Sequence, residues 1–357
     1  MKVLFFLLTT LFFASCNQTV DDIYFNGKVT NIKCDSVYQH IKAQSVFSPE
    51  FMYQFEPIVY DNLIIGQLYN QNFIFEVTNI NTGESLGKFV SKGNARNEMI
   101  SPSIVKNAFI ENNEIKVLVK DVDKKLSYKW NVTKSIEQNI TVFDFIVDYE
   151  DDSASDSYHY STLLDESKLL GYTQAFNVTE NQKCPERPVL VIKDVNSSEV
   201  YNEYYVFKKT FDNRTNEAMA SEDFFYSDTK ERPDKKYVVQ AMWFLPQINI
   251  INLETEKIKG FRLDKGLDFS IFNTPSLITH IYFCSGIHTT NDKIFVGYRG
   301  VTDNKSKEIY VFDWNGKLLK ACQLDIEYDK ILSDPITNKQ YVYQADTGEI
   351  FKVELDV

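Results

Sequence analysis

The chain has 357 residues, a formal net charge of −12 at pH 7 and an aromatic content of 14%. Nucleic-acid binding depends on lysine and arginine side chains that neutralise phosphates, so this acidic balance argues against a nucleic-acid partner. The high aromatic content favours β-sheets over helices, because aromatic side chains are enriched in strands.

The N-terminus has the features of a secretory signal. Lys2 is followed by an apolar run from Val3 to Phe13. A run of about ten apolar residues is too short to cross a bilayer, which takes roughly 20 in a helix. We therefore predict that residues 1–15 are a signal peptide. The residues Phe13-Ala14-Ser15-Cys16 resemble a bacterial lipobox, which implies that Cys16 is lipidated.

The alternative is an ordinary signal peptide that leaves Cys16 as a plain thiol. On the lipoprotein interpretation, residues 16–26 form a short lipid-anchored tether. Residues 27–357 then form the folded domain. Any contact with the membrane is expected to come from the lipid, because the chain carries no later apolar stretch of spanning length.

Strand-like segments recur along the folded domain and are joined in pairs by short polar turns. The clearest stretch is residues 292–324, where three segments rich in β-branched and aromatic residues follow one another. Asn315-Gly316 joins the last two and is typical of a type I′ hairpin turn. Similar turns are predicted near residues 83, 134, 197 and 255. A repeat of about 50 to 60 residues, four strands long, indicates the blades of a β-propeller.

The last repeat provides three strand-like segments, near residues 330–332, 340–343 and 349–353. A three-stranded blade would leave an open edge in the ring, and closure is how propellers remove such edges. The strand-like segment near residues 28–38 is expected to fill this place. The sequence thus predicts an all-β fold, a six-bladed β-propeller of four-stranded antiparallel blades whose last blade is completed by the N-terminal strand. An open set of sheets or a two-domain sandwich is the alternative.

Two polar stretches interrupt the repeat. Residues 148–157 are rich in aspartate and glutamate, and residues 208–236 carry charges of both signs. Both are predicted to be surface loops, the first between blades two and three and the second between blades three and four.

The lipobox, the hairpins and the last two repeats, residues 293–324 and 329–355, resemble TolB-like six-bladed β-propeller lipoproteins of Gram-negative bacteria. Members of that family often carry a Gly-Arg-Gly-Pro-Gly-Glu-Phe-like turn after the first blade. The matching segment here is residues 91–99, in which Gly93 and Glu98 match while the proline and two glycines are replaced. The resemblance implies a propeller fold and a place in the cell envelope, and it carries little chemistry.

Sequence motifs for catalysis, metal binding or cofactor binding were not found. His40, His159, His280 and His288 stand in no HExxH or HxH arrangement, and no GxSxG or phosphate-binding loop occurs. We therefore assign no catalytic residue, metal ligand or cofactor. The segment between His280 and His288 is predicted to hold an inner strand, residues 281–284. Both histidines are interpreted as hydrogen-bonded structural residues, with a channel-facing role as the alternative.

Four cysteines follow Cys16: Cys34, Cys184, Cys284 and Cys322. None has CxxC spacing, which makes a zinc site improbable. Three disulfide pairings are open to four cysteines in an oxidising envelope, and the sequence does not choose among them. Burial as free thiols is the favoured interpretation.

Two loops are expected to share one mouth of the ring. Loops from an outer strand to the next inner strand open on the same side as loops between middle strands, which groups residues 92–102 with residues 299–307. Arg96 and Arg299 are candidate ligand contacts, because a guanidinium can fork onto a carboxylate or a sugar hydroxyl. Tyr298 is a candidate for stacking on a sugar, although a tyrosine at a strand end is more often part of the core edge. Solvated arginines are the alternative.

These observations favour a non-catalytic ligand-binding or protein-interaction propeller that is lipid-anchored to the outer membrane, at its periplasmic or surface face. The expected partners are a glycan, a peptide or an envelope protein, and the protein is expected to be a monomer. One alternative is a hydrolase or lyase whose site lies in the central channel. Another is a purely structural envelope lipoprotein.

Overall fold

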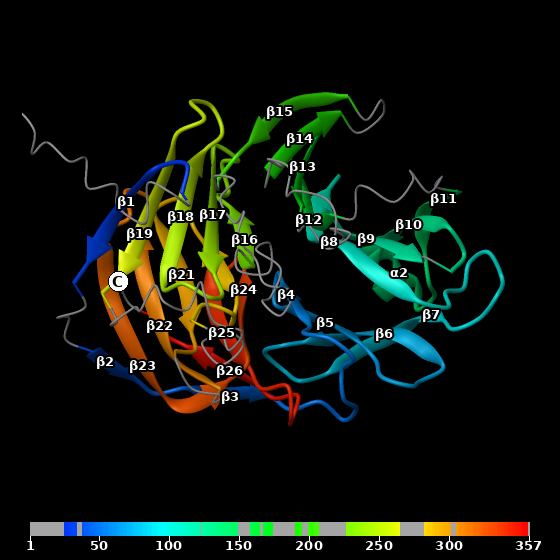
Figure 1. Ribbon diagram of the computed structural model, residues 1–357. Coiled ribbons are helices and arrows are strands. Elements are labelled where there is room, and N and C mark those ends of the chain that lie inside the picture. The colour runs from blue at the N-terminus through cyan, green and yellow to red at the C-terminus, as the bar shows by residue number, and fades with distance from the viewer. Residues whose placement is uncertain are drawn as a thin grey trace, which may run out of the picture.

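The computed structural model describes residues 25–33, 38–121, 123–148, 158–164, 167–173, 190–194, 199–206, 226–264, 282–300 and 305–355. These residues form six small, mainly antiparallel sheets arranged as a six-bladed β-propeller (Figure 1). The all-β fold predicted from the sequence is confirmed. Each blade runs from an inner strand near the ring axis to an outer strand at the rim.

Successive stretches of the chain build successive blades, inner strand first. Blade one consists of β4 (Ile58–Tyr60), β5 (Leu63–Gln67), β6 (Phe73–Asn79) and β7 (Ser85–Ser91). Blade two consists of β8 (Pro102–Glu111), β9 (Glu114–Asp121), β10 (Leu126–Asn131) and β11 (Phe143–Asp148). Blade three consists of β12 (Tyr158–Leu163), β13 (Lys168–Thr173), β14 (Leu190–Asp194) and β15 (Val200–Tyr204).

The second half of the ring follows the same order. Blade four contains β16 (Ser227–Glu231), β17 (Tyr237–Met242), β18 (Gln247–Asn252) and β19 (Ile258–Leu263). Blade five contains β20 (Ile287–Thr289), β21 (Lys293–Tyr298), β22 (Ser306–Asp313) and β23 (Leu318–Tyr328). Blade six contains β24 (Lys330–Asp334), β25 (Lys339–Tyr343) and β26 (Ile350–Val353).

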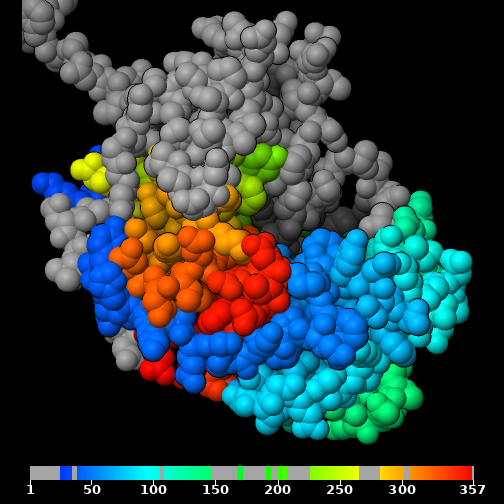
Figure 2. All heavy atoms as spheres, turned by 90° about the horizontal axis from the view of Figure 1, so that it is seen from below, coloured from blue at the N-terminus to red at the C-terminus, as the bar shows by residue number. Residues whose placement is uncertain are grey.

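The N-terminal segment adds one strand to each of the last three blades. Strand β3 (Gln44–Phe47) pairs antiparallel with β26 and completes blade six. Strands β1 (Lys28–Ile32) and β2 (Tyr38–Ile41) pair parallel with β19 and β23 as fifth strands of blades four and five. In Figure 2 the N-terminal residues form a blue band beside the orange and red atoms of blades five and six. An N-terminal strand does complete the last blade, but its predicted position near residues 28–38 is wrong.

Apolar side chains fill the spaces between neighbouring blades. In β21 the alternating side chains serve two interfaces, because Ile294 and Val296 pack toward blade four while Phe295 packs toward blade six. Between blades one and two, the ring of Trp130 stacks on Phe75 with centroids 5.0 Å apart. Because both faces of these strands are buried, their sequences are nearly continuous apolar runs.

A side-chain cap recurs at the turn between the third and fourth strands. In blade one, Asn79 Oδ1 accepts hydrogen bonds from the backbone N–H groups of Asn81 and Thr82 at 2.9 and 3.2 Å. In blade four, Asn252 Oδ1 accepts two such bonds, from residues 254 and 255, at 2.9 and 2.8 Å. This local bonding favours the turn over continuation of the strand.

The turn at Asn315-Gly316 is not of the predicted type I′. That type needs positive φ at both central residues, and of this pair only Gly316 has it, at 83°. Asp313 Oδ1 instead accepts a hydrogen bond from the Asn315 backbone at 2.9 Å and caps a longer turn. The strand pairing shifts register between Val311 and Phe312, as a β-bulge does.

Helix α2 (Val132–Gln138) lies where a hairpin turn was predicted in blade two. Asn131 is its N-cap, and its side chain accepts a hydrogen bond from the Lys134 backbone at 3.0 Å. The helix ends at Asn139, which has the left-handed conformation with φ 53°. The residue type that caps turns in blades one and four thus starts a helix here, and β11 begins only at Phe143.

Other boundaries also differ from expectation. The inner strand of blade five is β20 rather than residues 281–284, and β16 lies within the stretch predicted to be a loop, residues 208–236. Residues 149–157 and 207–225 lie outside the described residues. Cys284 and Cys322 are free thiols, while Cys34 and Cys184 lie outside the described ranges.

Candidate ligand-binding mouth

One end of the ring is formed by the loops that carry the predicted contact residues. We call this end the binding mouth and define it by residues 48–57, 68–72, 92–101, 299–300, 305 and 344–349, all within the described ranges. Residues 48–57 and 92–101 join an outer strand to the next inner strand, and the others lie between middle strands. Lys305 Nζ connects neighbouring blades here, at 3.2 Å from Asp329 and 2.6 Å from Asp346. The predicted grouping of the loops therefore matches the strand order.

Arg299 lies on the inner side of the mouth, at the end of β21. One guanidinium nitrogen donates to Cys284 Sγ at 3.9 Å, and the Arg299 backbone N–H donates to the Tyr282 carbonyl at 2.6 Å. These contacts fix the arginine against the segment that leads into β20.

Two charged residues from other blades, Asp228 and Lys330, lie close to Arg299 and Cys284. Asp228, on β16, accepts hydrogen bonds from Trp243 Nε1 at 3.2 Å and from the Gly286 backbone at 3.1 Å. Its carboxylate is 3.9 Å from Nζ of Lys330, the first residue of β24. Asp228, Cys284, Arg299 and Lys330 form what we call the inner cluster, which draws on blades four, five and six.

The electrostatics of the inner cluster favour charge recognition over nucleophilic chemistry. Burial alone would lower the pKa of Lys330, but the nearby carboxylates, with Asp228 first and Glu56 next, raise it overall. Burial raises the pKa of the Cys284 thiol, and the Arg299 guanidinium only partly offsets this. Because the thiolate is the reactive form, a cysteine with a raised pKa is a poor nucleophile at neutral pH.

Tyr298 is part of the core. It is 6% exposed, and its ring lies 5.3 Å from Phe283 and 5.1 Å from Tyr310, centroid to centroid. The structure thus places it at the core edge, which was the alternative to a stacking role. In this arrangement its ring face is not available to a sugar.

Arg96 lies on the loop between blades one and two and is exposed. One of its guanidinium nitrogens donates to the Ile146 carbonyl on β11 at 3.2 Å. The two predicted arginines therefore share the mouth but lie on different sides of the ring, Arg96 beside blade two and Arg299 on blade five. The described contacts do not bring them together.

Hydrogen bonds hold the loop of Arg96 in place. Glu98 accepts a bond from the Ala95 backbone at 2.9 Å, and the Gly93 backbone donates to the Met99 carbonyl at 3.0 Å. Lys124 of the neighbouring turn donates to the Glu98 carbonyl at 2.8 Å. The two residues that match the TolB-like turn, Gly93 and Glu98, thus have a structural role in shaping this loop.

The mouth also carries an exposed apolar patch that sequence reasoning missed. Its members surround the start of blade one and are each at least a third exposed: Met52, Phe55, Tyr69, Phe73 and Ile100. Phe55 and Tyr69 are 54% and 62% exposed, and the Tyr69 backbone donates to the Met52 carbonyl at 3.1 Å. At the opposite end, exposed Ile110 lies near the end of β8, while Ile140 and Ile336 lie on two separate turns. Grouped apolar side chains of this kind mark interaction sites.

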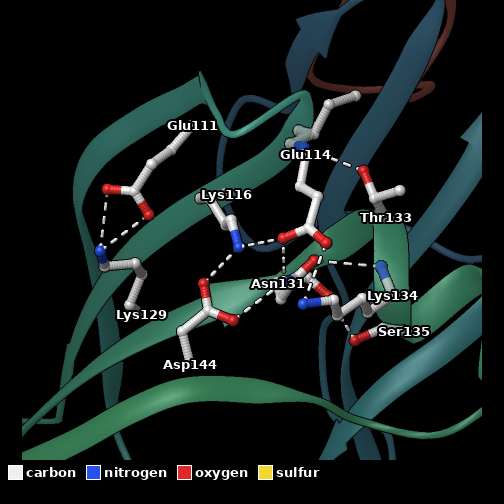
Figure 3. A network of polar contacts seen from close by, with 10 residues as sticks. Glu111, Glu114, Lys116, Lys129, Asn131, Thr133, Lys134, Ser135 and Asp144 are labelled. Carbon is white, nitrogen blue, oxygen red and sulfur yellow. Dashed lines mark hydrogen bonds and ion pairs between the residues drawn. The ribbon is translucent and has the colours of Figure 1, made fainter.

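A buried lysine lies away from the mouth, in blade two (Figure 3). Lys116 is 2% exposed and forms ion pairs with Glu114 and Asp144. Asn131 Nδ2 donates to both carboxylates, each at 2.9 Å, and Lys134 Nζ lies 2.9 Å from Glu114. Two lysines thus balance two carboxylates, which is the pattern of a structural network.

His288 also has a structural position. It is 2% exposed on β20 and stacks on Phe295 with ring centroids 5.3 Å apart. Among the described residues its Nε2 has no hydrogen-bond partner, so His288 is a stacked histidine and not the predicted hydrogen-bonded one. His280, for which the same role was predicted, lies outside the described residues. Burial, followed by the charge of Lys230, lowers its pKa to about 3.

The described ranges contain no group of three or more histidine, cysteine, aspartate or glutamate side chains arranged to hold a metal ion. Nor, within the same ranges, does any helix have the length and apolar character needed to span a bilayer. Cys16 lies outside the described residues.

No protein-family model matches the chain, and a search of curated proteins found no match. Two solved structures from Bacteroides are similar in fold. A protein described as exported, from Bacteroides fragilis, aligns with a TM-score of 0.57 and 12% identity, over 92% of this chain and all of that one. A member of the DUF4221 family from Bacteroides vulgatus gives a TM-score of 0.57 and 10% identity, over 89% of this chain and 97% of that one. At these identities the likeness shows the fold alone.

Proposed function

We propose that this chain is a non-catalytic recognition propeller that binds a protein or peptide partner at the binding mouth. The observation that carries this proposal is the gathering of five exposed apolar side chains around blade one, at the same end of the ring as Arg299. Aromatic side chains bring large contact area with little loss of side-chain freedom, and they dominate interface energetics.

The inner cluster complements this patch. Lys330 keeps its charge because carboxylates surround it, and Asp228 accepts hydrogen bonds on both oxygens. A partner that fills the mouth would meet an apolar surface on blade one and fixed charges on blades four to six. This combination supports binding with defined orientation.

We further propose that the protein acts in the cell envelope, attached by a lipid on Cys16. The apolar N-terminal run and the lipobox-like Phe13-Ala14-Ser15-Cys16 support this address. The exported description of the Bacteroides fragilis protein agrees with it. The resemblance to TolB-like propeller lipoproteins is part of the same proposal.

Photocrosslinking in living cells tests the proposed function. A photoreactive amino acid is placed at Tyr69 in the mouth and, as a matched control, at Ile336, which is exposed at the opposite end. We expect a discrete protein adduct from position 69 and none from position 336. Adducts only from position 336 would contradict a partner at this mouth, and adducts with glycan alone would replace the protein partner by a sugar.

A further inference from the structure

Blade four carries a row of buried polar side chains on the face that it turns toward blade three. Thr229, Gln240 and Asn249 lie opposite one another on β16, β17 and β18, and each is at most 9% exposed. In the part of the chain that the structure describes, no hydrogen-bond partner is found for Thr229 Oγ1, both polar side-chain atoms of Gln240 or Asn249 Nδ2. Val238 and Ile251, on the same face, pack against apolar residues of blade three. Unpaired polar groups in such an interface are unfavourable.

The corresponding row of blade five is apolar. Both blades have five strands and the same order, and the strand register places Ile287, Val296 and Tyr310 where blade four has Thr229, Gln240 and Asn249. The three blade-five residues pack into the core shared with blade four. The Tyr310 hydroxyl has a partner, Glu308, at 2.8 Å. The unpaired polar row therefore lies in the interface between blades three and four and has no counterpart in the interface between blades four and five. We call the interface between blades three and four the 3–4 seam.

The contacts between neighbouring inner strands also distinguish the 3–4 seam from the other interfaces. Around the ring, β16 lies against β20, β20 against β24, β24 against β4, β4 against β8, and β8 against β12. Among the described strands, the pair β12 and β16 makes no comparable contact. Among the described residues, the backbones of β12 and β16 thus do not come as close as those of the other neighbouring inner strands.

Contacts farther out, from the N-terminal segment, bridge the seam instead. The Asn26 backbone donates to the Val206 carbonyl at 2.9 Å, and Asn26 Nδ2 donates to the Tyr205 carbonyl at 2.8 Å. Phe25 is 3% exposed and belongs to the apolar cluster of blades three and four. One further bond crosses the seam, from the Tyr204 hydroxyl to the Leu253 carbonyl at 2.9 Å. Residues 25–26 thus fasten blade three to blade four before β1 begins.

We propose that the 3–4 seam opens reversibly in the native ring and that Phe25 and Asn26 act as its latch. Opening would hydrate the unpaired row of Thr229, Gln240 and Asn249, and this hydration offsets part of the free energy needed to separate the two blades. While the seam is closed, its unhydrated polar side chains make it less stable than the neighbouring blade interfaces. The contacts of Phe25 and Asn26 then determine how often the seam opens. Because Phe25 and Asn26 are the last two residues of the predicted tether, residues 16–26, a pull on that tether would act on the seam first. The proposal does not depend on the binding mouth.

Hydrogen exchange on the mature chain, measured by mass spectrometry, tests this proposal. In the wild type we expect amides of β16 and β17 to exchange about tenfold faster than those of β20 and β21. Phe25→Ala should raise exchange at the seam by a further factor of about ten, and leave blade six and blade one unchanged. Asn26→Ala, a milder change, should raise it by a smaller factor at the same amides.

Two further variants make the test specific. Ile41→Ala removes a buried apolar side chain of the same N-terminal segment, but on blade five, and should raise exchange there and not at the seam. Gln240→Val introduces the residue type of blade five, and should slow exchange at the seam by removing two unpaired atoms. Each of three results would overturn the proposal. They are equal protection of blades four and five in the wild type, a uniform effect of Phe25→Ala and Asn26→Ala around the ring, and faster exchange in Gln240→Val.

Discussion

The carboxylate of Glu98 occupies the space beside Gly93 that a β-carbon at that position would need. The same carboxylate accepts a hydrogen bond from the Ala95 backbone at 2.9 Å. Gly93→Ala must therefore displace Glu98 and break this bond. We expect a loss of about 1–2 kcal/mol in the free energy of unfolding, measured with urea.

A double-mutant cycle checks the cause. In a Glu98→Ala background the space beside Gly93 is free, so adding Gly93→Ala should cost almost nothing. Additive losses in the double variant would show that Gly93 has another role in the loop.

The blade strands could be predicted because burial on both faces leaves apolar runs and polar turns. Residues 293–298 and the turn at Asn79 are examples. The closing strand β3 was misplaced because Gln44 and Ser45 are exposed and only Phe47 is buried. Helix α2 was missed because its cap, Asn131, is of the type that caps turns in other blades.

The sequence could predict only the part of the candidate site that follows from the order of the strands. Strand order alone groups the loops of Arg96 and Arg299 at one mouth. Asp228 and Lys330 were missed because they are isolated charges on different blades, and only the ring brings them together. The exposure of Phe55 and Tyr69 depends on side-chain packing, which a sequence with 27 phenylalanines and 21 tyrosines does not reveal.

Lys116 provides a test of the network in blade two. Lys116→Met leaves the carboxylates of Glu114 and Asp144 facing each other without their buried cation. We expect a loss of roughly 2–3 kcal/mol in the free energy of unfolding, below the full value for a buried pair because both carboxylates stay about a fifth exposed. Chemical denaturation at pH 7 gives this value.

The matched control is Lys236→Met. Lys236 pairs with Glu254 at 2.8 Å, but both side chains are more than half exposed, and such pairs contribute little. Equal losses in the two variants would mean that burial does not strengthen the Lys116 network.

His288 predicts a pH dependence of stability. Its folded pKa of about 3 lies below the usual 6.5, so the unfolded chain binds a proton that the folded chain does not. Stability from this group is present above pH 6.5 and falls as the pH drops toward 3, by up to about 1.4 kcal/mol per pH unit. His288→Phe should therefore reduce the loss of stability between pH 6.5 and 5 by roughly 1.5 kcal/mol.

Urea unfolding at several pH values measures this slope. His40→Gln serves as the control, because His40 is exposed on β2. A slope that is unchanged in His288→Phe, or reduced equally in both variants, would contradict a buried neutral histidine.

The proposed lipid anchor predicts that Cys16→Ala yields uncleaved precursor or a species released from the membrane fraction, without labelled fatty acid. Lipobox processing requires the cysteine because its sulfur carries the lipid. Metabolic labelling with a fatty-acid analogue, followed by membrane fractionation, measures both effects. Cys322→Ala is the control, since that thiol is buried in blade five. Acyl labelling that persists in Cys16→Ala would disprove the anchor.

Binding at the mouth is tested most directly by affinity measurements on the mature protein. A panel of envelope peptides and glycans identifies a binder, and its affinity is then measured for Phe55→Ala, Tyr69→Ala and Arg299→Ala. We expect each aromatic variant to weaken binding about tenfold or more, and Arg299→Ala to weaken it for charged ligands. Ile140→Ala and Ile336→Ala, at the opposite end, should leave the affinity unchanged. Full affinity in the three mouth variants, with a loss in Ile140→Ala or Ile336→Ala, would place the ligand at the other end of the ring and contradict the proposed function.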